Sequence, residues 1–221
     1  MTAFTIKMIA LASMIIDHIG AVYDIDNFRL VGRLAFPIFV FLIAEGCKHT
    51  KSMDKYMLRL GLFALISEVP FDLAFNSYVD FFNDANIFYT LWLGVASIYM
   101  HRLLRNFLRN FSNILSVIPL CIAMIAAEWV GSDYGAVGVV FIFVMSVFGE
   151  FKPLQLMVIS LFMFILYFPF MDMLIASLIA VPIVAFASGR RGLPVKWLFY
   201  LAYPAHLLVL AALVNSSIIT S

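Results

Sequence analysis

Several acidic, basic and histidine side chains of this chain fall inside stretches that are otherwise apolar. His18 follows Asp17 in the first such stretch, and Glu68 and Asp72 are four residues apart in the third. An ionisable group placed within a membrane helix costs about 3 kcal/mol on insertion scales, so it usually faces the protein interior or a wet cavity and serves a function. A neutral imidazole can take a proton from an amine or hydroxyl, and a carboxylate can stabilise the imidazolium that forms. These residues therefore predict acid–base chemistry inside an apolar region.

The elements that must position these groups are long apolar segments. The chain has 221 residues, of which 64% are hydrophobic and 12% charged, whereas charged residues make up roughly a quarter of a soluble domain. Apolar stretches of about 18 residues suit a hydrocarbon layer about 30 Å thick. We predict an all-α, polytopic bundle of about nine transmembrane helices, forming one domain over residues 1–221. The predicted spans are 6–23, 30–46, 56–75, 86–104, 113–130, 135–149, 154–168, 171–187 and 197–214; the tight join near Pro169 decides whether eight or nine result.

The distribution of basic residues predicts the orientation of the bundle. With a cytoplasmic N-terminus, 12 of the 14 Lys and Arg residues fall at cytoplasmic helix ends, as the positive-inside rule requires. Arg29 and Arg33 lie on the outer side. The first apolar stretch has no small-residue cleavage pattern and is predicted to remain as a helix. The net charge of +1 indicates no nucleic-acid partner, and Cys47 and Cys121 offer no metal-binding spacing.

Helical rise places the ionisable groups at related depths. His18 and Glu68 each lie twelve residues from the inner end of their span, which is roughly 18 Å along a helix. Asp17 is expected to pair with another helix, with Arg33 as its natural counter-ion. Either this ion pair fixes helix register or it belongs to the chemistry, and Asp72 either caps the outer end of its helix or takes part in the reaction. The sequence leaves both alternatives open.

Weaker signals lie in other spans. Glu45 ends the second span on the cytoplasmic side. Asn86 and Thr90, four residues apart, are predicted to be an N-cap and a packing hydroxyl at the start of the fourth span. Tyr203 and His206 lie near the middle of the last one.

Six runs spread along the chain, taken in order, resemble the TraX family. They are KMIALASMIIDHIG at 7–20, GRLAFPIFVFLIAEG at 32–46, RLGLFALISEVPFD at 59–72, NIFYTL at 86–91, DYGAVGV at 133–139 and YPAHL at 203–207. Each run alone is weak, but the ordered set is specific. Residues 150–196 match only in hydropathy.

The resemblance implies a multi-pass enzyme of the bacterial inner membrane that moves an acetyl group from cytoplasmic acetyl-CoA to an acceptor on the outer side. The implied acceptor is the N-terminal amine of a pilin, or else a glycan, and no metal is implied. Larger related acyltransferases use an intramembrane histidine, which points to His18 as the base. From their depth and charge, Asp17, Arg33, Glu68 and Asp72 are expected to complete the catalytic set. Glu68 or Asp17 would hold the imidazole, and Arg33 or backbone donors would bind the oxyanion.

Acetyl-CoA would bring phosphate charges to the cytoplasmic side, where basic residues are concentrated. The positive-inside rule requires the same cations on this side, so their presence alone does not identify a binding site for acetyl-CoA. The expected cofactor-binding residues are Glu45, Lys48, Arg59, Asn86, Thr90, Tyr203 and His206.

Two other functions fit the same residues. A proton-coupled transporter would use Asp17, Glu68 and His206 as a relay and would move solute without acetyl-CoA. A non-catalytic scaffold would use its charged groups for helix assembly. In a scaffold, paired apolar replacements of Asp17 and Arg33 would preserve function.

Overall fold

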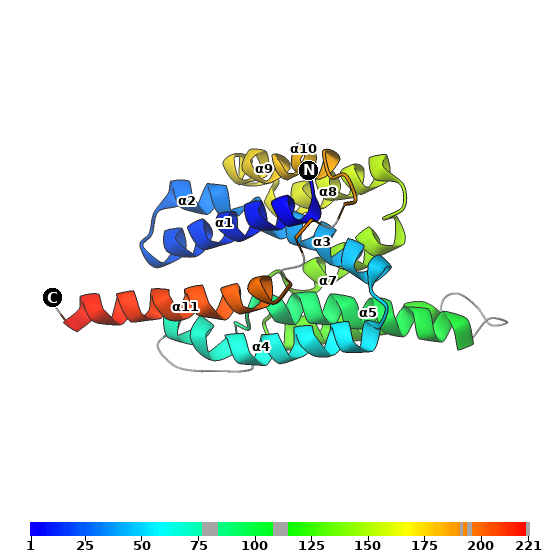
Figure 1. Ribbon diagram of the computed structural model, residues 1–221, viewed down its shortest axis with the longest axis horizontal. Helices are drawn as coiled ribbons and strands as arrows, with labels where there is room; N and C mark the ends of the chain where they lie inside the picture. The colour runs from blue at the N-terminus through cyan, green and yellow to red at the C-terminus, as the bar shows by residue number, and fades with distance from the viewer. Residues whose placement is uncertain (77–83, 108–114, 191, 194–195, 220–221) are drawn as a thin grey trace. The chain divides into compact units, whose positions relative to one another are not determined.

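The computed structural model describes residues 1–76, 84–107, 115–190, 192–193 and 196–219. Within these ranges all regular structure is helical (Figure 1), which confirms the all-α prediction. Each of the nine predicted segments contains a helix. The elements are α1 (Ala3–Val22), α2 (Asp26–Gly32), α3 (Ala35–His49), α4 (Met53–Phe75), α5 (Ile87–Phe107), the short 3₁₀ helix η1 (Leu115–Val117), α6 (Ile118–Trp129), α7 (Gly135–Val147), α8 (Lys152–Tyr167), α9 (Met171–Leu178), α10 (Ala180–Ala185) and α11 (Lys196–Ile219).

The prediction of about nine transmembrane helices requires correction. By length and composition, four stretches of the described residues can cross a membrane: Ala3–Val22, Asp26–His49, Ile87–Phe107 and Trp197–Val214. A helix needs about 20 apolar residues to cross a 30 Å layer, and α6, α7 and α8 have only 12, 13 and 16 residues. Helix α4 has 23 residues but includes Arg59, Glu68 and Asp72. The helices in these segments are therefore shorter, or more charged, than the spans that hydropathy predicts.

The chain forms two compact units, which are described separately. The first unit comprises Met1–Leu42, Pro70–Ser77 and Glu150–Ser221, and the second comprises Ile43–Val69 and Tyr78–Gly149. Helices α3 and α4 each begin in one unit and end in the other.

In the first unit, α1 packs against α2 and α11. The side chain of Thr2 accepts a hydrogen bond from the Thr5 amide at 3.2 Å and so caps the start of α1. Helix α2 folds back beside α1, and α11 also contacts it (Figure 1). Ser13, buried on α1, donates a 2.6 Å hydrogen bond to the Val31 carbonyl of α2. Helix α1 therefore has α2 and α11 as neighbours.

The second unit is centred on α5, which packs against α6 and α7. Two glycines of this unit permit close contact. A Cβ at Gly94 of α5 would lie 2.7 Å from Cδ1 of Ile142 on α7, and one at Gly61 of α4 would lie 2.9 Å from Nε1 of Trp92 on α5. Gly61 thus serves the close helix approach that small residues allow in membrane bundles.

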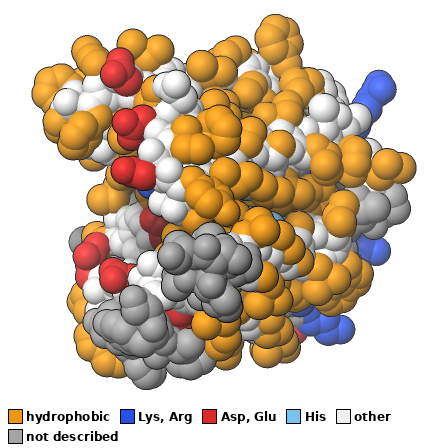
Figure 2. Space-filling model, turned by 90° about the vertical axis from the view of Figure 1, so that its left-hand side faces the viewer, with side chains coloured by type: hydrophobic (Ala, Val, Ile, Leu, Met, Phe, Trp, Pro, Cys, Tyr) orange, Lys and Arg blue, Asp and Glu red, His pale blue; other side chains and the backbone are white. Residues whose placement is uncertain are grey.

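Large apolar side chains lie on the outside of individual helices, as lipid-facing surfaces require. On α6, Ile118, Ile122, Ile125 and Trp129 follow one another at helical spacing and are 47% to 73% exposed. Figure 2 shows hydrophobic side chains over most of the face in view. Together with the four long apolar helices, this surface indicates a membrane protein.

The contact at Gly94 generates a test of the second unit. Gly94→Val should overpack the α5–α7 interface and cost about 1–3 kcal/mol, measured as a lower thermal unfolding temperature in detergent. Ile142→Ala alone should also destabilise, because it leaves a cavity. The double variant should lose clearly less than the sum of the two single losses, since each change offsets the other. Strict additivity would contradict the close contact.

Candidate functional site

Adjacent residues of α1 direct their side chains to two different neighbours. Successive residues on a helix are about 100° apart. Asp17 therefore contacts α2, whereas His18 contacts α11. This placement agrees with the prediction that Asp17 pairs with another helix, and it leaves the imidazole of His18 to a different partner.

Asp17 forms ion pairs with two arginines of one helical face. Its Oδ1 lies 2.6 Å from Arg33 Nη2 and its Oδ2 lies 2.8 Å from Arg29 Nη1. Asp17 and Arg33 are only 15% and 12% exposed, while Arg29 is 35% exposed. The predicted pair of Asp17 with Arg33 is confirmed. Arg29 was missed as a second partner, although its spacing of four residues from Arg33 places both on the same side of α2.

The turn between α2 and α3 makes the double pairing possible. Gly32, at the end of α2, lies so close to Asp17 that a Cβ there would collide with the carboxylate. Arg33 and Leu34 bond to carbonyls three residues back rather than four, at 3.2 and 3.3 Å, which is the tighter 3₁₀ pattern. Arg33 Nε also donates to the Arg29 carbonyl at 3.0 Å.

His18 is hydrogen-bonded to another histidine. Its Nδ1 lies 2.6 Å from Nε2 of His206 on α11. His206 Nδ1 lies 2.8 Å from the Ala202 carbonyl, one turn earlier on the same helix. The rings of Phe75 and Tyr203 meet the His18 ring edge-on, at centroid distances of 5.4 and 5.8 Å. The structure thus places His206, rather than Asp17, against the imidazole.

The sequence carried a signal for this contact that was interpreted differently. His206 and Tyr203 belong to the run YPAHL, and both are among the residues predicted to bind the cofactor. Both contact His18, so they belong to the same cluster as the expected base. Within the described part of the chain, no three or more His, Cys, Asp or Glu side chains gather so that they could hold a metal ion.

Glu68 lies in the second unit, where it binds the start of α5. It is fully buried. Its Oε2 accepts hydrogen bonds from the Asn86 side-chain amide and, at 3.2 Å, from the Asn86 backbone amide. Asn86 Oδ1 accepts from the Phe88 amide at 2.9 Å, which confirms the predicted N-cap. Glu68 therefore joins α4 to the capped end of α5, and its catalytic role stays a prediction.

Thr90 joins the same part of α5 to the turn before α7. Its hydroxyl lies 3.1 Å from Ser132 Oγ and donates to the Asp133 carbonyl. This fits the predicted packing hydroxyl; nothing here tests its role in cofactor binding.

Asp72 lies in the last turn of α4, within the first unit. It is fully buried, and its Oδ1 accepts a 2.8 Å hydrogen bond from the Asn76 side-chain amide, just beyond the helix. This contact fits the alternative in which Asp72 organises the helix end.

The expected cofactor-binding residues at the predicted cytoplasmic side have partners within the second unit. Lys48 pairs with Glu45 at 2.7 Å and also donates to the Gly149 carbonyl. The Arg59 guanidinium lies 5.9 Å from the centre of the Tyr56 ring. These contacts orient the basic side chains at the end of α3 and the start of α4.

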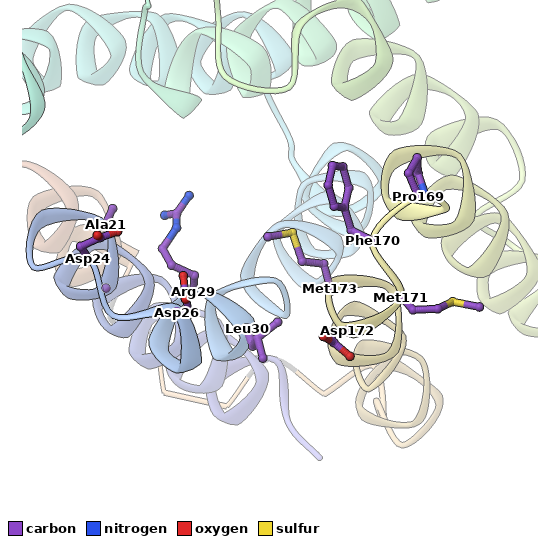
Figure 3. Close-up of a pocket in the computed structure, with 11 residues that line it drawn as sticks. Ala21, Asp24, Asp26, Arg29, Leu30, Pro169, Phe170, Met171, Asp172 and Met173 are labelled. Atoms are coloured by element: carbon purple, nitrogen blue, oxygen red, sulfur yellow. The ribbon is translucent and has the colours of Figure 1, made fainter.

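A pocket of about 660 Å³ opens beside the C-terminal end of α1 in the first unit. Figure 3 shows its walls, which come from residues 20–30 and from the corner between α8 and α9 at residues 169–173. Three exposed carboxylates, those of Asp24, Asp26 and Asp172, line it together with the apolar side chains of Phe170 and Met173. The pocket therefore combines three carboxylates and the guanidinium of Arg29 with an apolar wall. One of its lining residues, Gly20, follows His18 by two positions in α1.

The double ion pair predicts an unequal sensitivity of two aspartates. Asp17→Asn removes the charge that two guanidinium groups share, and breaking such a pair costs roughly 3–5 kcal/mol when it is fully buried. We expect a smaller loss here, because Arg29 keeps contact with solvent, but still a fall of several degrees in unfolding temperature.

Asp24→Asn is the matched control. Asp24 is exposed and has a φ of 56°, a conformation that Asn also tolerates. Equal unfolding temperatures for the two variants would contradict the structural role given to Asp17.

Comparison with known proteins gives two matches of similar extent. The sequence profile of the TraX protein family matches residues 3–214. The chain is also 26% identical, over 242 aligned positions, to a protein described as probable fimbrial assembly protein FimC, serogroup H1, of Dichelobacter nodosus. That alignment covers 96% of this chain and 95% of the relative. No solved structure matches.

Proposed function

Because the chain belongs to the TraX family, we propose that it is an acetyltransferase of the bacterial inner membrane that moves the acetyl group of cytoplasmic acetyl-CoA to an acceptor on the outer side. The observation that carries the proposal is His18, held by a 2.6 Å hydrogen bond to His206 within a long apolar helix. A relative named for fimbrial assembly supports an acceptor that belongs to a fimbria. The proposed acceptor is therefore a pilin, with its N-terminal amine as the acetylated group. A glycan is the second candidate acceptor.

The reaction needs a base. The nitrogen of the neutral amine attacks the thioester carbonyl, a C–N bond forms, and the C–S bond breaks to release the CoA thiolate. His18 accepts the proton that the amine loses and returns it to the thiolate, so no proton needs to enter or leave the site. An imidazole suits both steps, because its free ring nitrogen can accept a proton and the imidazolium that forms can donate it again.

The arginine–aspartate cluster supports stabilisation of the oxyanion. Two guanidinium groups share one carboxylate, which leaves one excess positive charge beside the residue that precedes His18. Preorganised positive charge of this kind lowers the barrier to acyl transfer, because negative charge develops on the carbonyl oxygen. Arg33, whose side chain is 12% exposed and is held by Asp17 and by the Arg29 carbonyl, is the proposed donor of hydrogen bonds to the oxyanion.

The pocket beside α1 suits the acceptor. By the orientation predicted from the basic residues, it opens on the outer side. Its carboxylates would attract a protonated amine, and its apolar wall would take a hydrophobic neighbouring group. The ammonium would pass its extra proton to solvent at these exposed carboxylates, and the neutral amine would then enter the site, where His18 takes the second proton.

Acetyl-CoA, the acetyl donor, would contact exposed cations at the predicted cytoplasmic side of the second unit. Lys51, Lys55 and Arg105 are exposed there, and multiple cations suit the phosphates of CoA. Lys48, paired with Glu45, and Arg59, beside Tyr56, would complete this basic surface. Two further basic residues at predicted cytoplasmic helix ends, Arg109 and Arg191, lie outside the described residues.

The role of His18 is tested by His18→Ala. Loss of a general base lowers the rate about 100-fold or more, so acetyl transfer from labelled acetyl-CoA in membranes should nearly vanish, while expression and unfolding temperature are kept. His101→Ala, on α5 of the second unit, is the matched control and should remain active. Normal transfer by His18→Ala would remove the proposed base. Solute flux by wild-type proteoliposomes without acetyl-CoA would favour the transporter instead.

The role of the exposed lysines is tested with two donors. The double change Lys51→Gln and Lys55→Gln should raise the KM for acetyl-CoA about fivefold, because two contacts to phosphate are weakened. The KM for acetyl-pantetheine, which lacks most of that charge, should not change. An equal effect on both donors would show that these lysines do not bind the phosphates.

A further inference from the structure

A hydrogen-bond chain with a single direction connects the backbone of α11 to His18. It begins at the Ala202 carbonyl, which can only accept a hydrogen bond. His206 Nδ1, 2.8 Å away, must therefore carry a hydrogen. In a neutral imidazole only one ring nitrogen is protonated, so Nε2 of His206 is left as an acceptor.

The second bond of the chain follows from the first. His206 Nε2 lies 2.6 Å from His18 Nδ1, which is too close for two lone pairs to face each other. A hydrogen must lie between the two atoms, and in the neutral pair it belongs to His18 Nδ1. The rings are only 16° from parallel, with centroids 4.9 Å apart. Combined with the short N–N distance, this places the rings edge to edge in an in-plane hydrogen bond.

The consequence falls on the other nitrogen of His18. With Nδ1 protonated, Nε2 carries the lone pair, and among the described residues none is hydrogen-bonded to it. The ring cannot easily turn over, because Phe75 and Tyr203 meet it edge-on from α4 and α11. The lone pair therefore has a fixed direction.

We infer that His206 is a positioning residue that fixes the tautomer and orientation of His18, so that Nε2 of His18 is the atom that accepts the proton. This deepens the acetyltransferase function and rests on it. When Nε2 takes the proton of the attacking amine, His18 becomes an imidazolium whose Nδ1–H donates a charge-assisted hydrogen bond to His206. His206 thus does with a neutral ring what a buried carboxylate does for the histidine of hydrolase triads.

A neutral histidine as the partner of His18 adds no charge to the site, whereas a carboxylate such as Asp17 would. A carboxylate against His18 would hold the imidazole but would also keep a permanent negative charge beside the thioester oxygen. Since Asp17 is bound to Arg29 and Arg33, that charge is already neutralised, and the ring is held without it. His18 can therefore take the proton of the amine while the arginines stabilise the negative charge on the carbonyl oxygen.

Two substitutions separate positioning from packing. His206→Leu removes the acceptor and should lower kcat for acetyl transfer roughly 10- to 100-fold, by analogy with the loss of the hydrogen-bond partner that orients a metal-binding histidine. The KM for acetyl-CoA should not change. His206→Gln keeps a side-chain oxygen that can accept from His18 Nδ1, so it should recover much of the rate. The variants are compared at equal unfolding temperature, with His101→Gln as the control.

The tautomer can be observed directly by ¹⁵N NMR of histidine-labelled protein in detergent micelles or nanodiscs. The chain has only four histidines, and the spectrum of His18→Gln identifies the His18 signals. Wild-type protein and His206→Gln should show His18 protonated on Nδ1 with Nε2 bare. In His206→Leu the proton should shift to Nε2. Retention of the wild-type tautomer in His206→Leu, or an unchanged kcat, would overturn the inference.

These measurements distinguish the inference from the function on which it rests. If the tautomer shifts as expected but the wild-type protein transfers no acetyl group, the positioning by His206 stands and the acetyltransferase function fails. If His18→Ala abolishes transfer while His206→Leu changes neither rate nor tautomer, the function stands and the positioning role is overturned.

Discussion

The pairing of one carboxylate with two guanidinium groups is the interaction on which the first unit depends. An isolated charge inside an apolar helix would be strongly unfavourable, so Asp17 can remain in α1 only because α2 supplies Arg29 and Arg33. The short α2 and the tight turn at Gly32 follow from this need, since they bring both cations to the same carboxylate. The ion pair thereby fixes the packing of α2 on α1.

This pairing also determines what His18 can do. Because Asp17 is fully occupied on one side of α1, the neighbouring imidazole must find its partner on the other side, and α11 provides it through His206. Two adjacent residues thus take different tasks. One anchors positive charge, and the other presents a nitrogen lone pair in a fixed direction, which is the combination that acyl transfer to an amine requires.

The second unit shows how a buried acid can serve structure. Glu68 bonds to both the side chain and the backbone of Asn86, and Asn86 in turn caps α5. These two hydrogen bonds to Oε2 offset part of the cost of burying the carboxylate. The position of Glu68 in an apolar segment is therefore explained by its role in joining α4 to α5. A chemical role would be a second function of the same side chain.

The sequence by itself determined where the nine helical segments lie, because the length of an apolar run, a cap such as Asn86 and a breaker such as Pro169 act locally. It did not predict the breaks between α2 and α3 and between α9 and α10, which fall within the predicted spans 30–46 and 171–187. It also determined which residue types had to be buried, and it indicated that Asp17 needed Arg33. Only the tertiary structure decided which partner each buried polar side chain binds, where several were available. Arg29 joined the ion pair, and His206, 188 residues away in the chain, took the imidazole of His18. The number of helices long enough to span a membrane was likewise decided by where turns form, since hydropathy is averaged over a window and cannot register the hydrogen bonds that end a helix. Helical periodicity fixes the face on which a side chain lies, but the neighbour that meets this face depends on packing between distant segments.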